Sequence, residues 1–308
     1  MSRGPESCVR VPATSANLGP GYDAFGLALD LCNEFEARPA ERWSVRVEGE
    51  GAGLLREDAS NQVVRAIQRV FSEVQAYERA ADIVCRNRIP VGRGLGSSAA
   101  AIVGGVVLGN RLTGERLSSQ RLLELATELE GHPDNVAAAL LGGFTVSVRD
   151  AGTVRAVRIN PAGGVAAVVV VGDAPLATST ARSALPPSVP HADAAANAGR
   201  AALVALGLAA GDAEMLRLGL HDLLHEQYRV SLMDEFVAIR SALDGAGVGP
   251  AVLSGAGPTV LGLVLGADDA DALGRAEAAA AAVVGALGGE RCERVLALGI
   301  ARPGLVQD

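Results

Sequence analysis

Residues 90–101, PVGRGLGSSAAA, place three glycines at alternate positions before two serines and an apolar run. Glycines at such positions let the main chain approach a ligand closely and adopt conformations that other residues avoid. The unpaired N–H groups and the dipole at the start of a helix favour an anion, and a serine hydroxyl can reach phosphate or Mg²⁺. The segment therefore predicts a phosphate-binding loop, although a tight serine-capped turn would show the same pattern.

The chain contains 27 arginines and no lysine. This excludes the lysine of a Walker-type loop, a Schiff-base lysine and a lysine general base. A dinucleotide fingerprint is a third interpretation of the glycines, but residues 110–114 read NRLTG where that motif needs an acidic residue. Two further glycine-rich loops, residues 11–26 and 254–259, favour a binding role, because three such loops seldom serve turns alone.

The elements that must position these loops can be read from the apolar spacing. A strand over 81–87 leads into the loop at 90–96, and the helix that begins at Ser97 is apolar nearly all round, which predicts a buried helix. The long apolar run at 164–172 is too short to cross a membrane and predicts a buried strand. The other elements that we expect are a strand over 7–13, a loop over 173–190 and helices over 61–78, 118–131, 134–141, 191–208, 211–226 and 234–246.

Length and composition predict a protein of two domains. A chain of 308 residues with 49% hydrophobic content can bury a large core, and we place the domains at 1–160 and 161–308. A formal charge of −8 and only 3% aromatic residues argue against binding to nucleic acid. The N-terminus has no signal-peptide pattern, and the four cysteines have no metal or disulfide spacing. We therefore expect a cytoplasmic protein that does not bind membranes.

The three loops resemble the three motifs of the GHMP kinases, whose ATP-binding loop lacks a Walker lysine. Within that superfamily, residues 11–26, 130–143, 178–186 and 224–229 are similar to the homoserine kinase family, and the resemblance covers essentially the whole chain. It implies an α+β fold with an N-terminal domain like domain 2 of ribosomal protein S5 and a ferredoxin-like C-terminal domain. It also implies a homodimer that phosphorylates the side-chain hydroxyl of L-homoserine in threonine biosynthesis. The alternatives are a GHMP kinase for another small alcohol and a catalytically silent nucleotide-binding regulator.

The resemblance assigns ATP and Mg²⁺ to particular positions. Magnesium takes few protein oxygens beside phosphates, and Ser98 and Glu130 match the family's metal positions. Glu128 lies two residues away and is more typical of a solvated helix glutamate. Asn61 matches a position near the adenine, although a helix-capping role fits it nearly as well. The residues expected to hold the nucleotide are Asn61, Val91, Gly92, Arg93, Gly94, Leu95, Gly96, Ser97, Ser98, Ala99, Ala100 and Ala101.

The same resemblance supplies a site for an amino acid. Arg182 and Arg229 match the arginines that bind its carboxylate, for which a guanidinium fork is well suited. Asp23 and Asp134 suit its ammonium group. The remaining positions, for fixing the substrate and holding the reacting hydroxyl, are His132, Asn17 and Asn135.

Two chemical questions remain open in the sequence. The chain has no lysine that could assist a carboxylate base at Asp134, and Asp134 is expected to bind the substrate ammonium. We therefore expect phosphoryl transfer by positioning and charge stabilisation, without a dedicated base. His221 and His225 are four apart on the expected helix, but no third metal ligand is evident. We expect His225 instead to orient Arg229.

Overall fold

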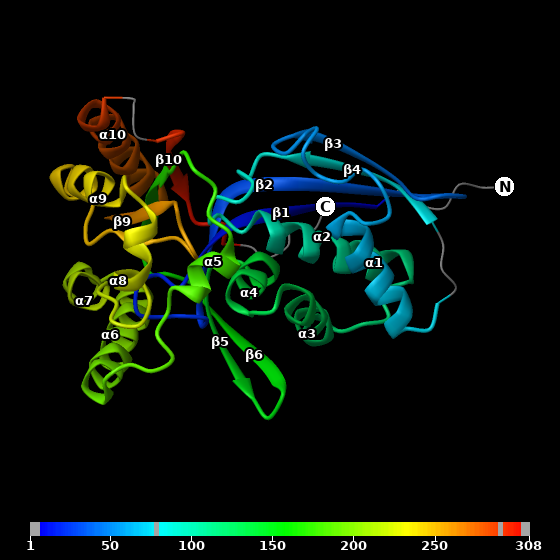
Figure 1. Ribbon diagram of the computed structural model, residues 1–308, viewed down its shortest axis with the longest axis horizontal. Helices are drawn as coiled ribbons and strands as arrows, with labels where there is room; N and C mark the ends of the chain where they lie inside the picture. The colour runs from blue at the N-terminus through cyan, green and yellow to red at the C-terminus, as the bar shows by residue number, and fades with distance from the viewer. Residues whose placement is uncertain (1–6, 77–79, 289–291, 303–308) are drawn as a thin grey trace.

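The structure is a computed structural model that describes residues 7–76, 80–288 and 292–302. Its N-terminal half contains a sheet in the order β3-β4-β2-β5-β6, with β1 paired to β2. Figure 1 shows helices α1 to α4 gathered on one side of strands β1 to β4. The elements of this half are β1 (Ser7–Ala16), β2 (Phe25–Ala40), β3 (Ser44–Gly49), α1 (Gln62–Glu73), β4 (Ala80–Asn87), α2 (Ser97–Leu112), α3 (Ser119–Glu130), α4 (Asp134–Leu141), β5 (Phe144–Asp150) and β6 (Thr153–Ile159).

Helix α2 is the central element of this half, and its burial confirms the prediction from its apolar sequence. Every residue from Ile102 to Asn110 is buried. Glycine allows α1 to approach closely, because a Cβ on Gly105 would lie 2.5 Å from the Cβ of Ala66. The helix is thus fixed along its length, and its first residue, Ser97, has a defined place at the end of the phosphate loop.

The C-terminal half forms a four-stranded antiparallel sheet in the order β10-β7-β9-β8. Strands and helices follow one another as in the ferredoxin-like βαββαβ arrangement, which confirms the expected α+β fold. The elements are β7 (Gly164–Val171), α5 (Thr178–Ser183), α6 (His191–Ala210), α7 (Ala213–Gly219), α8 (Glu226–Arg229), the 3-10 helix η1 (Val230–Leu232), α9 (Phe236–Gly245), β8 (Val252–Leu253), β9 (Val260–Gly266), α10 (Asp269–Leu287) and β10 (Arg294–Gly299).

Strand β7 is apolar throughout because both of its faces are covered. Val168 and Val170 belong to the core beneath α9 and α10, whereas Val169 and Val171 belong to the core that includes α6, α7 and the first sheet. The buried strand predicted from the apolar run at 164–172 is therefore confirmed. We propose that the domain boundary lies between residues 160 and 161, in the short connection from β6 to β7.

Three sequence expectations differ from the structure. The single helix expected over 211–226 is wrong, because α7 ends at Gly219 and α8 begins only at Glu226. Between them the Asp222 carboxylate accepts the N–H groups of Leu224, His225 and Glu226, which a continuous helix would use for its own carbonyls. The loop expected over 173–190 contains α5. The helix expected over 61–78 ends at Glu73, and residues 77–78 lie outside the described part of the chain.

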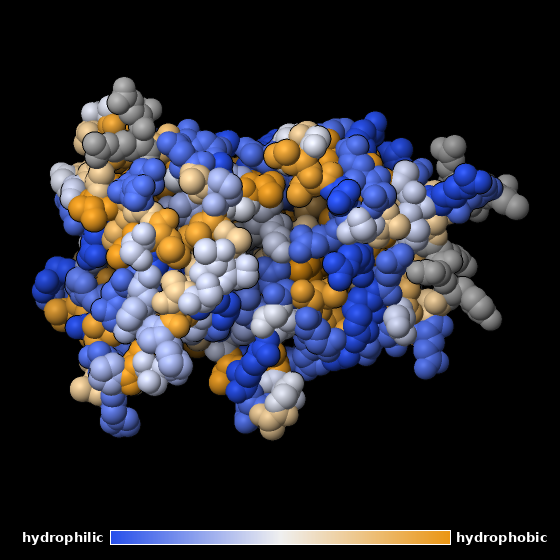
Figure 2. Space-filling view, viewed as in Figure 1, coloured by the Kyte–Doolittle hydropathy of each residue, from blue (hydrophilic) through white to orange (hydrophobic). Residues whose placement is uncertain are grey.

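The surface is mixed in character. Figure 2 shows hydrophilic side chains predominating over α1 and α3, with apolar side chains interspersed elsewhere on the same face. Within the described ranges, none of the helices combines the length and the hydropathy that crossing a membrane requires.

Glu226, at the start of α8, makes folding depend on pH. Its side chain is buried, its Oε1 accepts the N–H of Leu253 at 2.6 Å, and burial raises its pKa from 4.5 to about 8. The folded protein therefore binds this proton more tightly than the unfolded chain. The contribution to stability is complete below pH 4.5 and is lost as the pH rises through 8.

We expect Glu226→Gln to remove this dependence while keeping the acceptor for Leu253. Between those pH values the group lowers the free energy of unfolding by up to about 1.4 kcal/mol per pH unit. Urea unfolding of both proteins on either side of the upper pKa measures the effect, and the variant should gain relative stability at the higher pH. An equal stability difference at both pH values would contradict this assignment.

Candidate active site

The phosphate loop is folded tightly between β4 and α2, and its glycines are required there. Gly92, Gly94 and Gly96 have φ of 70°, 78° and 70°, in the left-handed region. A Cβ on Gly94 would lie 2.4 Å from the carbonyl oxygen of Ser254, and a Cβ on Gly96 would lie 1.9 Å from Thr14 Oγ1. The loop is thus built against β1 on one side and against the 254–259 segment on the other.

The 254–259 segment supports the phosphate loop through hydrogen bonds to its carbonyl groups. Ser254 Oγ donates to the carbonyl of Gly94 at 2.6 Å, and the Thr259 hydroxyl donates to the carbonyl of Arg93. The N–H groups of Gly255 and Gly257 are themselves bonded, to the carbonyls of Ala16 and Ser254. Both hydroxyls and the N–H groups of Gly255 and Gly257 are thus used within the protein, while residues 255–257 also line the cavity next to the phosphate loop.

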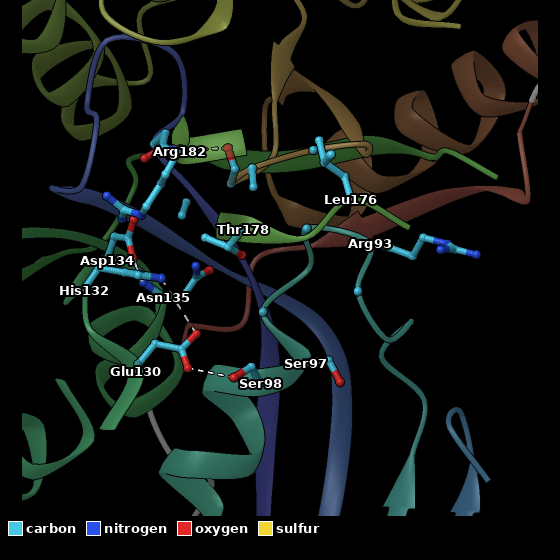
Figure 3. A pocket seen from close by; sticks show the side chains of 18 of the residues that line it. Arg93, Ser97, Ser98, Glu130, His132, Asp134, Asn135, Leu176, Thr178 and Arg182 are labelled. Carbon is cyan, nitrogen blue, oxygen red and sulfur yellow. Dashed lines mark hydrogen bonds and ion pairs between the residues drawn. The ribbon is translucent and has the colours of Figure 1, made fainter. Parts of the chain in front are cut away.

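The start of α2 is the candidate anion site. Its first-turn N–H groups have no acceptor within the helix, and Ser97 and Ser98 line the cavity next to the loop. Figure 3 shows the Arg93 side chain directed away from Glu130 and Asp134. Its Nε lies 2.9 Å from Glu293 Oε2. Of the other expected nucleotide contacts, the side chains of Leu95, Ala99 and Ala100 are fully buried. These three residues can therefore offer a nucleotide only their main chain.

Two oxygen-bearing side chains meet at the edge of the loop. Ser98 Oγ lies 2.7 Å from Glu130 Oε2 (Figure 3). It also accepts a hydrogen bond from Gln62 Nε2 at 2.9 Å. Burial raises the pKa of Glu130. A hydroxyl and a carboxylate beside a phosphate site are the donor set that suits Mg²⁺. Glu128, by contrast, is half-exposed and pairs with Arg69.

The expected substrate residues line the same cavity as the start of α2, and its charges are arranged unevenly. Asp23 and Arg182 form a bidentate pair, with nitrogen–oxygen distances of 2.6 and 3.0 Å. Arg229 is buried, and among the described residues no carboxylate lies within 4.0 Å of its guanidinium. A buried cation without a counter-ion is costly unless a ligand supplies one. The cavity therefore favours a ligand that carries a carboxylate.

The polar residues between the arginines and the loop are held by hydrogen bonds. Asn17, with φ of 70°, donates from Nδ2 to the carbonyl of Gly255 at 2.8 Å and accepts the N–H of Asp23 on Oδ1 at 3.0 Å. Asn135 Oδ1 accepts from the hydroxyl of Thr14 at 2.7 Å. Both amides are therefore pre-oriented beside the phosphate loop.

Asp134 and His132 form a second fixed pair in this cavity (Figure 3). Asp134 Oδ1 lies 2.6 Å from His132 Nδ1 and accepts the N–H of Asn135 at 2.7 Å. Burial lowers the pKa of His132, but the hydrogen bond to Asp134 and the negative charges of Asp134 and Glu130 together outweigh burial, so the pKa is raised. His132 Nδ1 and the N–H of Asn135 thus both contact the same carboxylate oxygen of Asp134.

A second cavity adjoins the first and shares Gly92, Ser97 and Ser98 with it. The predicted residues Asn61, Val91 and Ala101 line it. Asn61 also caps α1, since its Oδ1 accepts the N–H of Val63 at 2.9 Å, which confirms the capping role expected for it. Apolar and small side chains from the strands complete the lining, among them Phe35, Val47 and Cys85.

Some site residues were not expected from the sequence. The Tyr22 hydroxyl accepts from Arg182 Nη1 at 2.8 Å, and its ring centroid lies 5.6 and 5.4 Å from the guanidinium carbons of Arg182 and Arg229. Tyr22 directly precedes Asp23 in the first loop, which was the available signal. Thr178 and Leu176 also line the cavity, within or just before the 178–186 motif.

A phosphate loop without lysine, set between a ferredoxin-like sheet and a second α+β domain, defines a phosphotransferase of the kinase type. The GHMP kinases N terminal domain matches residues 61–143, and the GHMP kinases C terminal domain matches residues 201–284. The chain belongs to the GHMP kinases and, as its relatives show, to their homoserine kinase family.

The relatives agree over nearly the whole length. The homoserine kinase of Streptomyces coelicolor is 50% identical over 276 residues, which cover 88% of this chain and 87% of the relative. That of Gloeobacter violaceus is 45% identical over 260 residues, covering 83% and 87%. The crystal structure of homoserine kinase from Cytophaga hutchinsonii superposes with a TM-score of 0.85 at 27% identity, covering 99% of both chains.

Proposed function

We propose that this kinase transfers the γ-phosphoryl group of ATP to the side-chain hydroxyl of L-homoserine and forms O-phospho-L-homoserine, as threonine biosynthesis requires. The observation that carries the proposal is the buried Arg229, without a carboxylate partner among the described residues, beside the Asp23–Arg182 pair. A carboxylate on Arg229 and Arg182 and an ammonium on Asp23 would satisfy all three charges. The same ligand's hydroxyl would then lie toward the phosphate loop. As the resemblance implies, we further propose a cytoplasmic homodimer.

The two adjoining cavities fit the parts of the nucleotide. The base would occupy the cavity of Phe35, Asn61 and Val91, and the polyphosphate would extend along Gly92 to the start of α2. Ser98 and Glu130 would hold Mg²⁺, which supplies charge neutralisation for the phosphates when bound.

The side chains act mainly by positioning. Asn17 and Asn135, already fixed by Gly255 and Thr14, would orient the substrate hydroxyl toward the loop. The first-turn amides of α2 stabilise negative charge on the transferred group. Asp134 is engaged by His132 and by a main-chain N–H, which supports transfer without a dedicated base.

A coupled assay of ADP release tests the proposed function. L-homoserine, mevalonate and a sugar alcohol are each supplied with ATP and Mg²⁺, and the phosphorylated product is identified by mass spectrometry. Stimulation by L-homoserine alone supports the proposal, and turnover of another alcohol instead would reject the substrate. ATP binding by calorimetry without turnover of any alcohol would establish the silent-regulator alternative.

The proposed metal ligands predict a change in magnesium dependence. Glu130→Gln should raise the Mg²⁺ concentration for half-maximal activity about tenfold or more, because a neutral amide is a weaker ligand for a hard cation than a carboxylate. Glu128→Gln, which removes a half-exposed carboxylate two residues away, serves as the matched control and should leave that concentration nearly unchanged. Equal Mg²⁺ dependence of the two variants would remove Glu130 from the metal site.

A further inference from the structure

Hydrogen bonds within the protein occupy most of the N–H donors of the Arg229 guanidinium. A guanidinium carries five N–H groups and no acceptor. Arg229 Nε lies 3.3 Å from the carbonyl oxygen of Ala181, and Nη1 lies 3.1 Å from that of Gly255 and 3.2 Å from His225 Nδ1. With Nε and Nη1 engaged within the protein, Nη2 is the nitrogen left to serve a ligand in the cavity that Arg229 lines.

The contacts of His225 determine its tautomer. Its ring is fully buried, and Nε2 lies 2.9 Å from the carbonyl oxygen of Gly19, which can only accept. Nε2 therefore carries the proton. Nδ1 faces Arg229, which can only donate, so Nδ1 must be bare and the ring neutral. Burial also lowers the pKa of His225, which agrees with a neutral ring.

The ring is held in this position from two further sides. The N–H of His225 donates to Asp222 Oδ2 at 2.6 Å, which fixes its main chain before α8. The Tyr22 ring packs against the imidazole with centroids 5.2 Å apart. The imidazole thus has little freedom to turn away from Arg229.

We propose that His225 is a positioning residue of the carboxylate site, acting as a neutral Nε2–H imidazole that accepts from Arg229 Nη1. This inference rests on the proposed function and deepens it, because it explains how one face of the Arg229 fork is aimed. His225 does not contact the substrate. The bond from Nε2 to Gly19 holds the ring in place, and the bare Nδ1 is the acceptor that orients Arg229.

Two variants separate this role from simple packing. In His225→Asn the amide replaces the ring near the position of Nδ1, so an acceptor for Arg229 is kept and the bond to Gly19 is lost. In His225→Gln the amide reaches the position of Nε2, so the bond to Gly19 is kept and the acceptor for Arg229 is lost. Steady-state kinetics of both variants give KM for L-homoserine, KM for ATP and kcat.

We expect His225→Gln to raise KM for L-homoserine about tenfold or more, as loss of a hydrogen bond to a charged group should. His225→Asn should remain close to the wild type in this constant, and KM for ATP should change little in either variant. An equal rise in both variants, no rise in His225→Gln, or a parallel rise in KM for ATP would overturn the proposal.

Nitrogen NMR of the ligand-free enzyme tests the geometry independently of the substrate. The His225 ring, identified by its absence from the spectrum of His225→Asn, should show a protonated Nε2 and a bare Nδ1 near neutral pH. A protonated Nδ1 would overturn the proposal even if L-homoserine is a substrate. If the wild type does not phosphorylate L-homoserine, the proposed function fails, and this spectrum still decides the role of His225.

Discussion

Gly94→Ala is expected to lower kcat/KM for ATP at least about a hundredfold, a loss equivalent to some 3 kcal/mol. The added methyl would lie 2.4 Å from the carbonyl oxygen of Ser254 and 2.9 Å from that of Gly257. Both are main-chain atoms, so the loop itself must shift. The amides that are proposed to hold the polyphosphate would then leave their positions, and misplacement of this size weakens transition-state binding severely.

Gly92→Ala is the matched control for this variant. Gly92 has φ of 70°, close to the 78° of Gly94, so both substitutions impose similar backbone strain. A Cβ at Gly92, however, would meet only Pro175 Cβ, at an ordinary 3.7 Å. Steady-state kinetics with varied ATP should show a far smaller loss for Gly92→Ala. Equal losses would mean that left-handed strain, and not the contact with the 254–259 segment, controls the loop.

Arg229→Met should lower kcat/KM for L-homoserine about a thousandfold, because truncating one side of a desolvated charge pair costs roughly 2–5 kcal/mol. The methionine fills much of the volume but provides none of the three hydrogen bonds and no charge. KM for ATP should change little. Arg217→Met, at an exposed arginine paired with Glu214, should behave as the wild type does.

The alcohol L-homoserinol, which lacks the carboxylate, shows whether this loss comes from that group. It should be a poor substrate for the wild type, since Arg229 would stay without a counter-ion. Arg229→Met and the wild type should then use L-homoserinol almost equally. A loss with L-homoserinol as large as that with L-homoserine would show that the variant has damaged the site as a whole.

The fold could be predicted from sequence wherever one pattern decided an element. Strand β7 is apolar without interruption because it separates two cores, and α2 is apolar all round because its neighbours cover it. The helix expected over 211–226 was wrong for a different reason. The Asp222 carboxylate captures three successive N–H groups, a side-chain bond that competes with helix formation and that periodicity does not detect.

The charged residues of the site could be predicted from the sequence, but the hydrogen bonds that connect them to the main chain could not. Asp23, Asp134, Arg182 and Arg229 come from distant segments, yet they line one cavity with Ser98, as the resemblance implied. The carbonyl of Gly255, which accepts from both Asn17 and Arg229, was missed because a main-chain oxygen has no signature in sequence. Of the cavity proposed for the base, Asn61, Val91 and Ala101 were expected, whereas Phe35 and Cys85 were missed because they have the spacing of ordinary strand residues.

The hydroxyls of Ser254 and Thr259 affect how the two halves of the chain unfold and how they can be exchanged between relatives. They come from one half of the chain and hold carbonyls of the other half, at Gly94 and Arg93. We therefore expect both halves to unfold in a single thermal transition. In an isolated N-terminal fragment, the phosphate loop should be less ordered. In a chimaera assembled from two relatives, the segment with these two hydroxyls and the loop that they bind would have to come from the same parent.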